Sequence, residues 1–206
     1  MNQKFFVIEG IDGSGKSTLA EGLFKKITEK YKCIKISEPT NESLWGKEIR
    51  NILKSGQKQD KALSLKLREL FKKDRIWDIE NRILPALENN KIVLLDRYYF
   101  STAAYQGETN NEVNEIINEY KEDSKIINPH CVLYLNLGIE EALQRVKQRN
   151  DKKEIFEYRD SLKRIINNYE YILRTHKFSF PIYVLNAKNN IHDLLTEAAG
   201  ILKIPL

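Results

Sequence analysis

The chain is poor in the features that build disulfide frameworks, metal clusters and membrane spans. Only two of its 206 residues are cysteines, Cys33 and Cys131, and neither has neighbours at metal-ligand spacing, so a disulfide scaffold is excluded. No apolar run approaches the roughly 18–20 residues that a membrane-spanning helix needs. The apolar residues 5–8 are too few for a signal peptide, and no small-residue cleavage site follows them. We therefore expect no membrane partner and a reducing, cytoplasmic setting.

Linkers, repeats and low-complexity tracts are missing as well. A length of 206 residues fits one domain, 1–206. The formal net charge is +5, but acidic residues are interleaved with the Lys and Arg along the chain, and no basic stripe with aromatics is present. This pattern argues against a nucleic-acid polymer as partner and favours a solvated surface with a phosphate-rich ligand.

Short apolar runs alternate with longer helical patterns throughout the chain. The runs cover residues 5–9, 33–37, 91–96, 131–137 and 182–185. Near-continuous hydrophobicity, as at 92–95, is typical of parallel strands covered on both faces. Apolar residues at helical spacing mark residues 17–31, 61–88, 140–149, 158–177 and 191–202. The alternation predicts an α/β fold, a doubly wound five-stranded parallel sheet that binds its ligands at the carboxyl ends of the strands.

A phosphate-binding loop follows the first predicted strand. The residues are Gly10, Ile11, Asp12, Gly13, Ser14, Gly15, Lys16, Ser17 and Thr18. They match the pattern G-x-x-x-x-G-K-[ST] in its required context, with a strand before it and a helix after it. The glycines allow backbone N–H groups to approach ATP phosphates, Lys16 reaches the outer phosphates, and the Ser17 hydroxyl is a ligand for Mg²⁺.

Charged residues at two further positions suggest a second substrate. Asp12 lies inside the loop, where its carboxylate would repel phosphate, so we expect it to point away towards a sugar hydroxyl. Asp96 and Arg97 end the third apolar run. Asp96 is a candidate Mg²⁺ ligand through water, and Arg97 offers a planar cation to a phosphate.

Two more segments have the composition of a nucleotide pocket. Phe71 and Arg75 are four residues apart, on one face of a predicted helix. A base could stack on Phe71 while Arg75 bonds its edge. Downstream, small hydroxyl residues, alanines and a Tyr-Gln pair suit a snug polar wall, and the candidates are Ser101, Thr102, Tyr105 and Gln106.

Together these residues resemble the thymidylate kinases of the P-loop nucleoside monophosphate kinase group, over nearly the whole chain. The most specific match is Asp96-Arg97-Tyr98-x-x-Ser101-Thr102-x-Ala104-Tyr105-Gln106-Gly107. The resemblance implies an acceptor phosphate on Arg97 and a sugar 3′-hydroxyl on Asp12. It also implies a thymine base that stacks on Phe71 and is read at its edge by Arg75 and Thr102.

The chain departs from the family pattern at several positions. Ser37 and Thr40 replace the Arg and the first Gly of an Arg-Glu-Pro-Gly segment. Gly13 stands where some members have a catalytic Arg, so the chain resembles the members whose catalytic cation lies in a small helical lid. The lid insert is expected at about 145–157, and its candidate cations are Arg149, Lys152 and Lys153.

The resemblance implies transfer of the γ-phosphoryl group of Mg-ATP to dTMP, giving dTDP and ADP, in a homodimer. Tyr105 would crowd the 2′ position of the sugar and so favour deoxynucleotides. The candidate catalytic residues are Lys16, Arg97, Asp12 and Arg149, because phosphoryl transfer needs positioning and positive charge more than covalent chemistry.

Three alternatives stay open at this point. A deoxynucleoside (thymidine) kinase would need a general base, for which Glu38 is the candidate. A monophosphate kinase for another base, such as uridylate, would prefer a substrate with a 2′-hydroxyl. A P-loop ATPase that binds nucleic acid would hydrolyse nucleotide in response to a polynucleotide.

Overall fold

Five parallel strands form the centre of the molecule. The computed structural model describes residues 4–56, 60–147 and 155–204. Within them the sheet has the order β2-β3-β1-β4-β5, and all neighbouring strands are parallel. The strands are β1 (Phe5–Gly10), β2 (Cys33–Ser37), β3 (Ile92–Asp96), β4 (Cys131–Asn136) and β5 (Ile182–Asn186). This confirms the predicted fold class, and each observed strand end lies within one residue of its prediction.

Burial on both faces explains the near-continuous apolar sequence of the central strands. Every residue of β1 and β3 is buried, and so is β4 except for its last residue. In the middle of the sheet, Val7 pairs with Leu95 of β3 on one side and with Val132 of β4 on the other. Since neither face meets water, no polar alternation is needed. The outer strands β2 and β5 are partly exposed, as their edge positions require.

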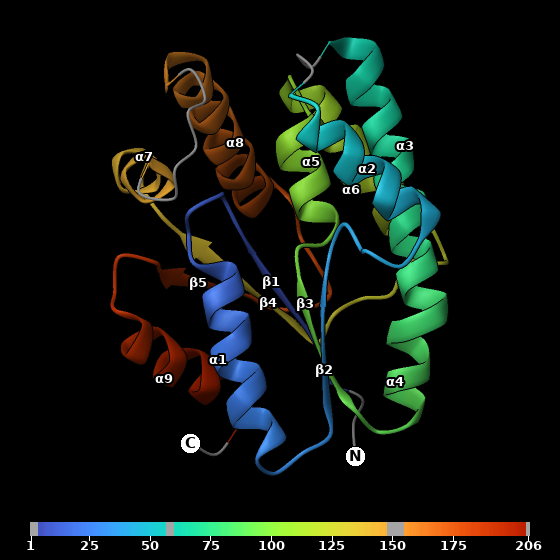
Figure 1. Ribbon diagram of the computed structural model, residues 1–206, viewed down its shortest axis with the longest axis vertical. Helices are drawn as coiled ribbons and strands as arrows, with labels where there is room; N and C mark the ends of the chain where they lie inside the picture. The colour runs from blue at the N-terminus through green and yellow to red at the C-terminus, as the bar shows by residue number, and fades with distance from the viewer. Residues whose placement is uncertain (1–3, 57–59, 148–154, 205–206) are drawn as a thin grey trace.

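Helices cover both faces of the sheet (Figure 1). On one face, α1 (Lys16–Thr28) packs against β1, β2 and β3, and α9 (Ile191–Ile201) lies beside α1 and contacts β5. On the other face, α4 (Leu84–Glu88) contacts β3, while α5 (Tyr99–Gln106) contacts β1 and α8 (Ile155–Thr175). The remaining helices are α2 (Leu44–Lys54), α3 (Lys61–Asp78), the π-helix η1 (Ile79–Ile83), α6 (Asn110–Glu122) and α7 (Ile139–Lys147).

The long helix predicted at 61–88 is built from three consecutive pieces, α3, η1 and α4. Pro85 lies in the first turn of α4, and proline has no N–H for the preceding turn and crowds its carbonyl groups. The chain widens into a π-helix just before the proline, where the Leu84 N–H bonds to the Ile79 carbonyl. A single π turn thus absorbs the proline without ending the helical run.

Three helices are missing from the predicted set: α2, α5 and α6. All residues of α5 except Tyr105 are buried, so no polar stripe marks this segment as a helix. The other two helices do carry N-cap signals. Ser43 Oγ accepts a bond from Gly46 N at 2.8 Å, and Thr109 Oγ1 accepts one from Glu112 N at 3.2 Å. Such caps are typical of helix starts and identify α2 and α6.

Most buried apolar side chains form one core around the sheet. A second, smaller apolar cluster lies between α2 and α3 and contains Ile49, Leu63, Leu67 and Leu70. In the parts of the chain that the structure describes, no helix combines the length and hydrophobicity needed to cross a bilayer.

Candidate active site

The phosphate loop begins where β1 ends, at the carboxyl edge of the sheet. Gly10 and Gly15 have φ angles of 144° and 95°, which side-chain-bearing residues rarely adopt. A Cβ atom on Gly10 would also lie 2.8 Å from the Leu135 carbonyl oxygen. The loop leads directly into α1, which begins at Lys16. A helix N-terminus with a tight glycine loop before it offers several N–H groups to an anion.

Lys16 is buried at the start of α1, and its Nζ donates to the Ile11 carbonyl at 2.8 Å. Burial, followed by the charge of Arg97, lowers the pKa of Lys16 to about 8. An anion placed beside this ammonium would raise the pKa again, because it stabilises the charged form. The charge of Lys16 is therefore coupled to the binding of a phosphate.

Ser17 and Asp96 join the loop to the end of β3. Ser17 Oγ donates to Asp96 Oδ2 at 2.7 Å. Among the described residues, the other carboxylate oxygen, Oδ1, is buried and has no hydrogen-bond partner. A buried oxygen without a partner is costly unless a ligand satisfies it. Hard oxygen atoms of this kind suit Mg²⁺, which binds one or two carboxylates and keeps several waters, so the two residues fit a magnesium site.

Arg97 follows β3 and turns towards the phosphate loop. Its backbone is left-handed, with a φ angle of 75°. The guanidinium forms an ion pair with Asp12 and donates to Ser101 Oγ at 3.1 Å and to Tyr105 Oη at 3.3 Å. It also lies 5.0 Å from the centre of the Tyr105 ring, a cation–π contact. Three further candidate residues, from the phosphate loop and α5, therefore meet around the Arg97 guanidinium.

Arg75 is a buried cation on α3. Both Glu38 carboxylate oxygens accept bonds from it, and its Nη2 donates to Thr102 Oγ1 at 3.2 Å. Its Nη1 is buried and has no partner among the described residues. Burial raises the pKa of Glu38, and the charge and hydrogen bonds of Arg75 oppose this rise. Arg75 is therefore a fixed donor with one unused nitrogen, and not an exposed helix cation.

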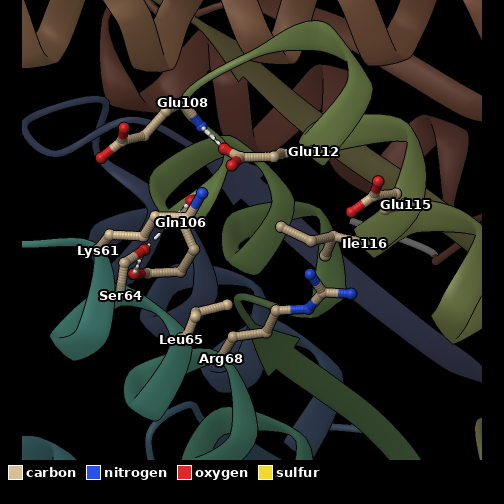
Figure 2. A pocket seen from close by; sticks show the side chains of 9 residues that line it. All are labelled: Lys61, Ser64, Leu65, Arg68, Gln106, Glu108, Glu112, Glu115 and Ile116. Atoms are coloured by element: carbon tan, nitrogen blue, oxygen red, sulfur yellow. Dashed lines mark hydrogen bonds between the residues drawn. The ribbon is translucent and has the colours of Figure 1, made fainter.

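Phe71 and Gln106 have different surroundings. Phe71 is half-buried and packs against the apolar cluster between α2 and α3. Gln106 is buried, and Ser64 Oγ lies 3.2 Å from both its backbone and its side-chain carbonyl oxygen. Gln106 lines a hollow of about 270 Å³ between α3 and α6, and Arg68 of α3 and Glu115 of α6 also line it (Figure 2). The structure thus places Gln106 beside α3 and α6, away from the lining of the cavity that contains Lys16.

That cavity, of about 290 Å³, joins the phosphate loop to Arg97. Its charged lining consists of three cations and three carboxylates: Lys16, Arg50 and Arg97, with Asp12, Glu38 and Asp96. The cations match phosphate oxygens, and the carboxylates match a metal ion and hydroxyl groups. The cavity therefore offers groups that suit phosphate oxygens and a divalent cation.

Arg50 is a lining residue that the sequence analysis did not identify. It lies on α2, and its Nη2 donates to the Pro39 carbonyl. Within the described part of the chain, its Nε is buried without a hydrogen-bond partner. On sequence alone, one Arg in an amphipathic helix is indistinguishable from a surface cation. Only the packing of α2 beside the loop that follows β2 brings it into the cavity.

The three candidate lid cations, Arg149, Lys152 and Lys153, lie outside the described residues. The nearby Arg145 on α7 is described, and it donates to the Gly13 carbonyl at 3.3 Å and to the Ala187 carbonyl at 2.9 Å. Arg145 thus ties the phosphate loop to the segment that follows β5.

The parallel sheet, the glycine loop before α1 and the Asp-Arg pair after β3 define a P-loop nucleotide kinase. The family model for thymidylate kinase matches residues 8–198. A thymidylate kinase of Leptospira borgpetersenii is 40% identical over 171 residues, which cover 82% of this chain and 80% of the relative. A probable thymidylate kinase of Thermococcus gammatolerans is 32% identical over 205 residues, 97% of this chain and 95% of the relative. The chain therefore belongs to the thymidylate kinase family.

Proposed function

We propose that this protein transfers the γ-phosphoryl group of Mg-ATP to dTMP, giving dTDP and ADP. The observation that carries the proposal is the single cavity shared by Lys16 of the phosphate loop and the guanidinium of Arg97. Two cation-lined ends of one cavity suit one donor and one acceptor phosphate group. The printed names of the relatives supply the base and sugar of the acceptor.

On the donor side, the loop residues from Gly10 to Thr18 bind the ATP phosphates through backbone N–H groups. Lys16 turns from the Ile11 carbonyl to the outer phosphates and neutralises the charge that develops during transfer. Ser17 and Asp96 hold Mg²⁺, with Asp96 acting through water. When bound, the metal ion would supply positive charge that screens the phosphate oxygens.

On the acceptor side, Arg97 binds the phosphate of dTMP and holds its oxygen in line for attack, so no strong general base is needed. Asp12 accepts a hydrogen bond from the sugar 3′-hydroxyl, and its ion pair with Arg97 restrains that guanidinium. Ser101 restrains the same guanidinium from the other side. Arg50 adds a second guanidinium near Ser37, the position at which this chain lacks the Arg of the family pattern.

The base is recognised beside α3. Arg75 presents its unused Nη1 to the base edge with Thr102 next to it, and Phe71 offers its ring for stacking. Tyr105 is held by Arg97 and restricts the space at the sugar 2′ position. We propose Gln106 as a neighbour that shapes this site from the α3 side.

The buried pair of Glu38 and Arg75 favours a monophosphate over a nucleoside as acceptor. A nucleoside kinase needs an available carboxylate to take up the hydroxyl proton. Glu38 is instead engaged through both oxygen atoms by Arg75. The carboxylate that would serve as general base is thus used for positioning.

We also propose the wider organisation that the family suggests. The chain acts as one kinase domain, 1–206, in a cytoplasmic homodimer, with no membrane or nucleic-acid polymer as partner. A lid at about 145–157 supplies Arg149 as the catalytic cation, with Lys152 and Lys153 as the alternative residues.

A coupled assay of ADP release, run with dTMP, dUMP, UMP and thymidine, tests the proposal. We expect the highest kcat/KM with dTMP and a loss of about tenfold or more for dUMP, which lacks one methyl group. Thymidine should give almost no ADP above the background of ATP hydrolysis. Preference for thymidine or UMP over dTMP would overturn the proposal.

A further inference from the structure

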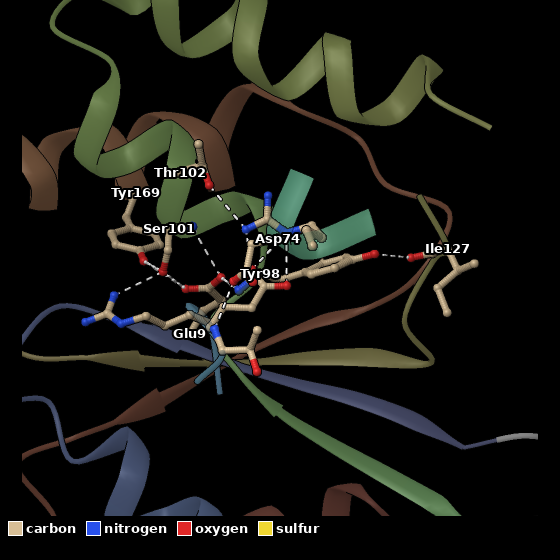
Figure 3. Close-up of polar contacts among 11 residues, drawn as sticks. Glu9, Asp74, Tyr98, Ser101, Thr102, Ile127 and Tyr169 are labelled. Atoms are coloured by element: carbon tan, nitrogen blue, oxygen red, sulfur yellow. Dashed lines mark hydrogen bonds and ion pairs between the residues drawn. The ribbon is translucent and has the colours of Figure 1, made fainter. Parts of the chain in front are cut away.

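A buried carboxylate lies beneath Arg97 and is used by no step described so far. Glu9 is the residue before the glycine loop, on β1, and it is 1% exposed. Its Oε1 accepts bonds from the backbone N–H groups of Tyr98, at 2.6 Å, and Ser101, at 3.2 Å. Its Oε2 accepts bonds from Ser101 Oγ at 2.7 Å and from the Tyr169 hydroxyl at 2.8 Å. Figure 3 shows these groups converging on Glu9.

The first pair of bonds fixes the backbone that follows Arg97. The helix α5 begins at Tyr99, and its N-cap residue Tyr98 provides no capping side chain. The Glu9 side chain, on β1, takes the place of the missing cap by accepting bonds from the N–H groups at the start of α5. A carboxylate at a helix N-terminus is also stabilised by the helix dipole. Because the Tyr98 N–H belongs to the peptide bond after Arg97, this contact restrains the left-handed turn at Arg97.

The second pair of bonds sets the orientation of a hydroxyl group that meets the Arg97 side chain. Ser101 Oγ and Tyr169 Oη both donate to the same carboxylate oxygen, so both hydroxyl groups direct their protons at Glu9. Burial, together with the Glu9 charge, raises the pKa of Tyr169, which keeps the phenol protonated. The Ser101 oxygen accepts from Arg97 Nη1, 3.1 Å away, and it also lies 2.9 Å from the Tyr169 hydroxyl oxygen.

Tyr169 is anchored independently of this contact. It lies on α8, where the preceding residue, Asn168, donates to the carbonyl groups of Ala104 at 2.9 Å and Gly107 at 2.8 Å. The Tyr169 ring also packs on Tyr134 of β4, with the ring centres 5.1 Å apart. The phenol therefore reaches Glu9 from a helix already attached to the end of α5, and its position is fixed.

We propose that Glu9, together with Tyr169, is a positioning residue for acceptor binding. Glu9 restrains the backbone next to Arg97 and directs the Ser101 lone pairs at the Arg97 guanidinium, which holds Arg97 in the orientation that receives the phosphate. This inference rests on the proposed function only in naming dTMP as the acceptor. Neither residue touches a substrate.

The test uses Glu9→Gln and Tyr169→Phe in the full-length enzyme, with Tyr134→Phe as the matched control. The control loses the same atom from the neighbouring ring, and its hydroxyl is not among the groups that bind Glu9. We expect kcat/KM for dTMP to fall about 10–100-fold in Glu9→Gln and about tenfold in Tyr169→Phe, as is usual when a supporting residue is removed. KM for ATP should stay unchanged, and Tyr134→Phe should behave as wild type.

A double-mutant cycle separates positioning from general structural damage. In an Arg97→Ala background, Tyr169→Phe should cause no further loss in kcat/KM, because its effect passes through Arg97. An additive loss would overturn the proposal, and so would an equal rise of KM for ATP and dTMP. Tyr169→Phe keeps the ring, so this arm remains informative if Glu9→Gln fails to fold.

A ligand-free measurement makes the outcome independent of the substrate. NMR of the Arg97 guanidinium should show slow hydrogen exchange in the wild type and in Tyr134→Phe, and exchange about tenfold faster in Tyr169→Phe. Equal exchange rates would refute the positioning role, even in a protein that phosphorylates dTMP. Failure to phosphorylate dTMP with the exchange pattern intact would refute only the proposed function.

Discussion

The two ends of the cavity are built in different ways. The donor end is formed by one contiguous segment, residues 10–18, whose backbone and glycines create the anion site. The acceptor end is formed by side chains from α2, the loop after β2 and the end of β3. Its Arg97 is held by Asp12, and its Glu38 is held from behind by Arg75 of α3. A contiguous backbone site needs little support from the rest of the fold, whereas a site made of buried charges depends on each partner.

The cations at the two ends also differ in how burial affects their charge. At the donor end, Lys16 is buried beside carbonyl oxygens, and its pKa is lowered to about 8. At the acceptor end, Arg75 keeps a carboxylate partner and remains charged. Above pH 8, Lys16 therefore regains its charge only when phosphate arrives, whereas the arginines of the acceptor end are charged before the ligand binds. We expect substitutions at the two ends to separate function from stability.

The largest expected effect is on folding, from breaking the buried pair at the acceptor end. Glu38→Ala leaves Arg75 buried without its partner and should lower the free energy of unfolding by about 3–5 kcal/mol. Urea denaturation measures the loss. The control is Glu140→Ala, which breaks an exposed pair with Arg159 and should cost at most about 1 kcal/mol. Equal losses in the two variants would show that buried Arg75 depends on its carboxylate partner no more than the exposed Arg159 does.

The next effect is on catalysis, at the donor end. Lys16→Ala should lower kcat by about 10²–10³-fold, the effect of one preorganised electrostatic contact. Its free energy of unfolding should not fall, because burial of this ammonium already disfavours its charged form. Thermal denaturation and the coupled assay measure both, with the exposed Lys25→Ala on the same helix as control. A large loss of stability with normal turnover would contradict the role given to Lys16.

Most of the fold was predictable because the central strands obey simple rules. Runs such as Ile92–Asp96 are buried on both faces and therefore read as continuous apolar sequence. The segment Tyr99–Gln106 was not recognised as a helix, since burial on all sides removes the polar stripe that periodicity detects. The π turn at Ile79–Ile83 was also missed, because the nearby proline predicts a disturbance but not its geometry.

The site was predictable where its residues are neighbours in sequence. The phosphate loop and Asp96-Arg97 follow strands directly, so the sheet topology brings them together. Arg50 and Glu9 were missed, since nothing near them in sequence distinguishes an Arg on a helix or a Glu in a strand. Their roles arise from packing between elements: α2 against the loop after β2, and α5 against β1. Side-chain partnerships of this kind require the structure.

A smaller effect, on the pH dependence of ATP affinity, tests the charge assigned to Lys16 at the donor end. If phosphate binding restores the proton of Lys16, ATP affinity should be constant below the free-protein pKa of about 8. Above that pH, the dissociation constant should rise by about tenfold per pH unit until the pKa of the bound state is reached. Calorimetry in two buffers of different ionisation enthalpy should detect proton uptake. Lys16→Arg should abolish the pH dependence, and a flat profile in the wild type would exclude the coupling.

The smallest effect concerns Asp78, a buried carboxylate of α3 close to Arg82. Its Oδ1 accepts a bond from Arg82 at 3.2 Å, and its Oδ2 is buried without a partner among the described residues. Burial raises the pKa of Asp78 from its ordinary value of 3.8 to about 7. Between these values the folded state binds more protons than the unfolded state, so this group makes the protein less stable as pH rises.

Asp78→Asn removes that titration and keeps the shape of the side chain. Relative to wild type, the variant should gain about 1 kcal/mol in the free energy of unfolding when the pH is raised from 6 to 8. Urea denaturation at both pH values measures the gain, and the titration of Glu38 cancels because both proteins retain it. A difference that stays constant between pH 6 and pH 8 would mean that Arg82 keeps Asp78 ionised over this range. The acceptor end would then hold its carboxylates charged in the folded protein, and burial would not be the dominant influence on their pKa.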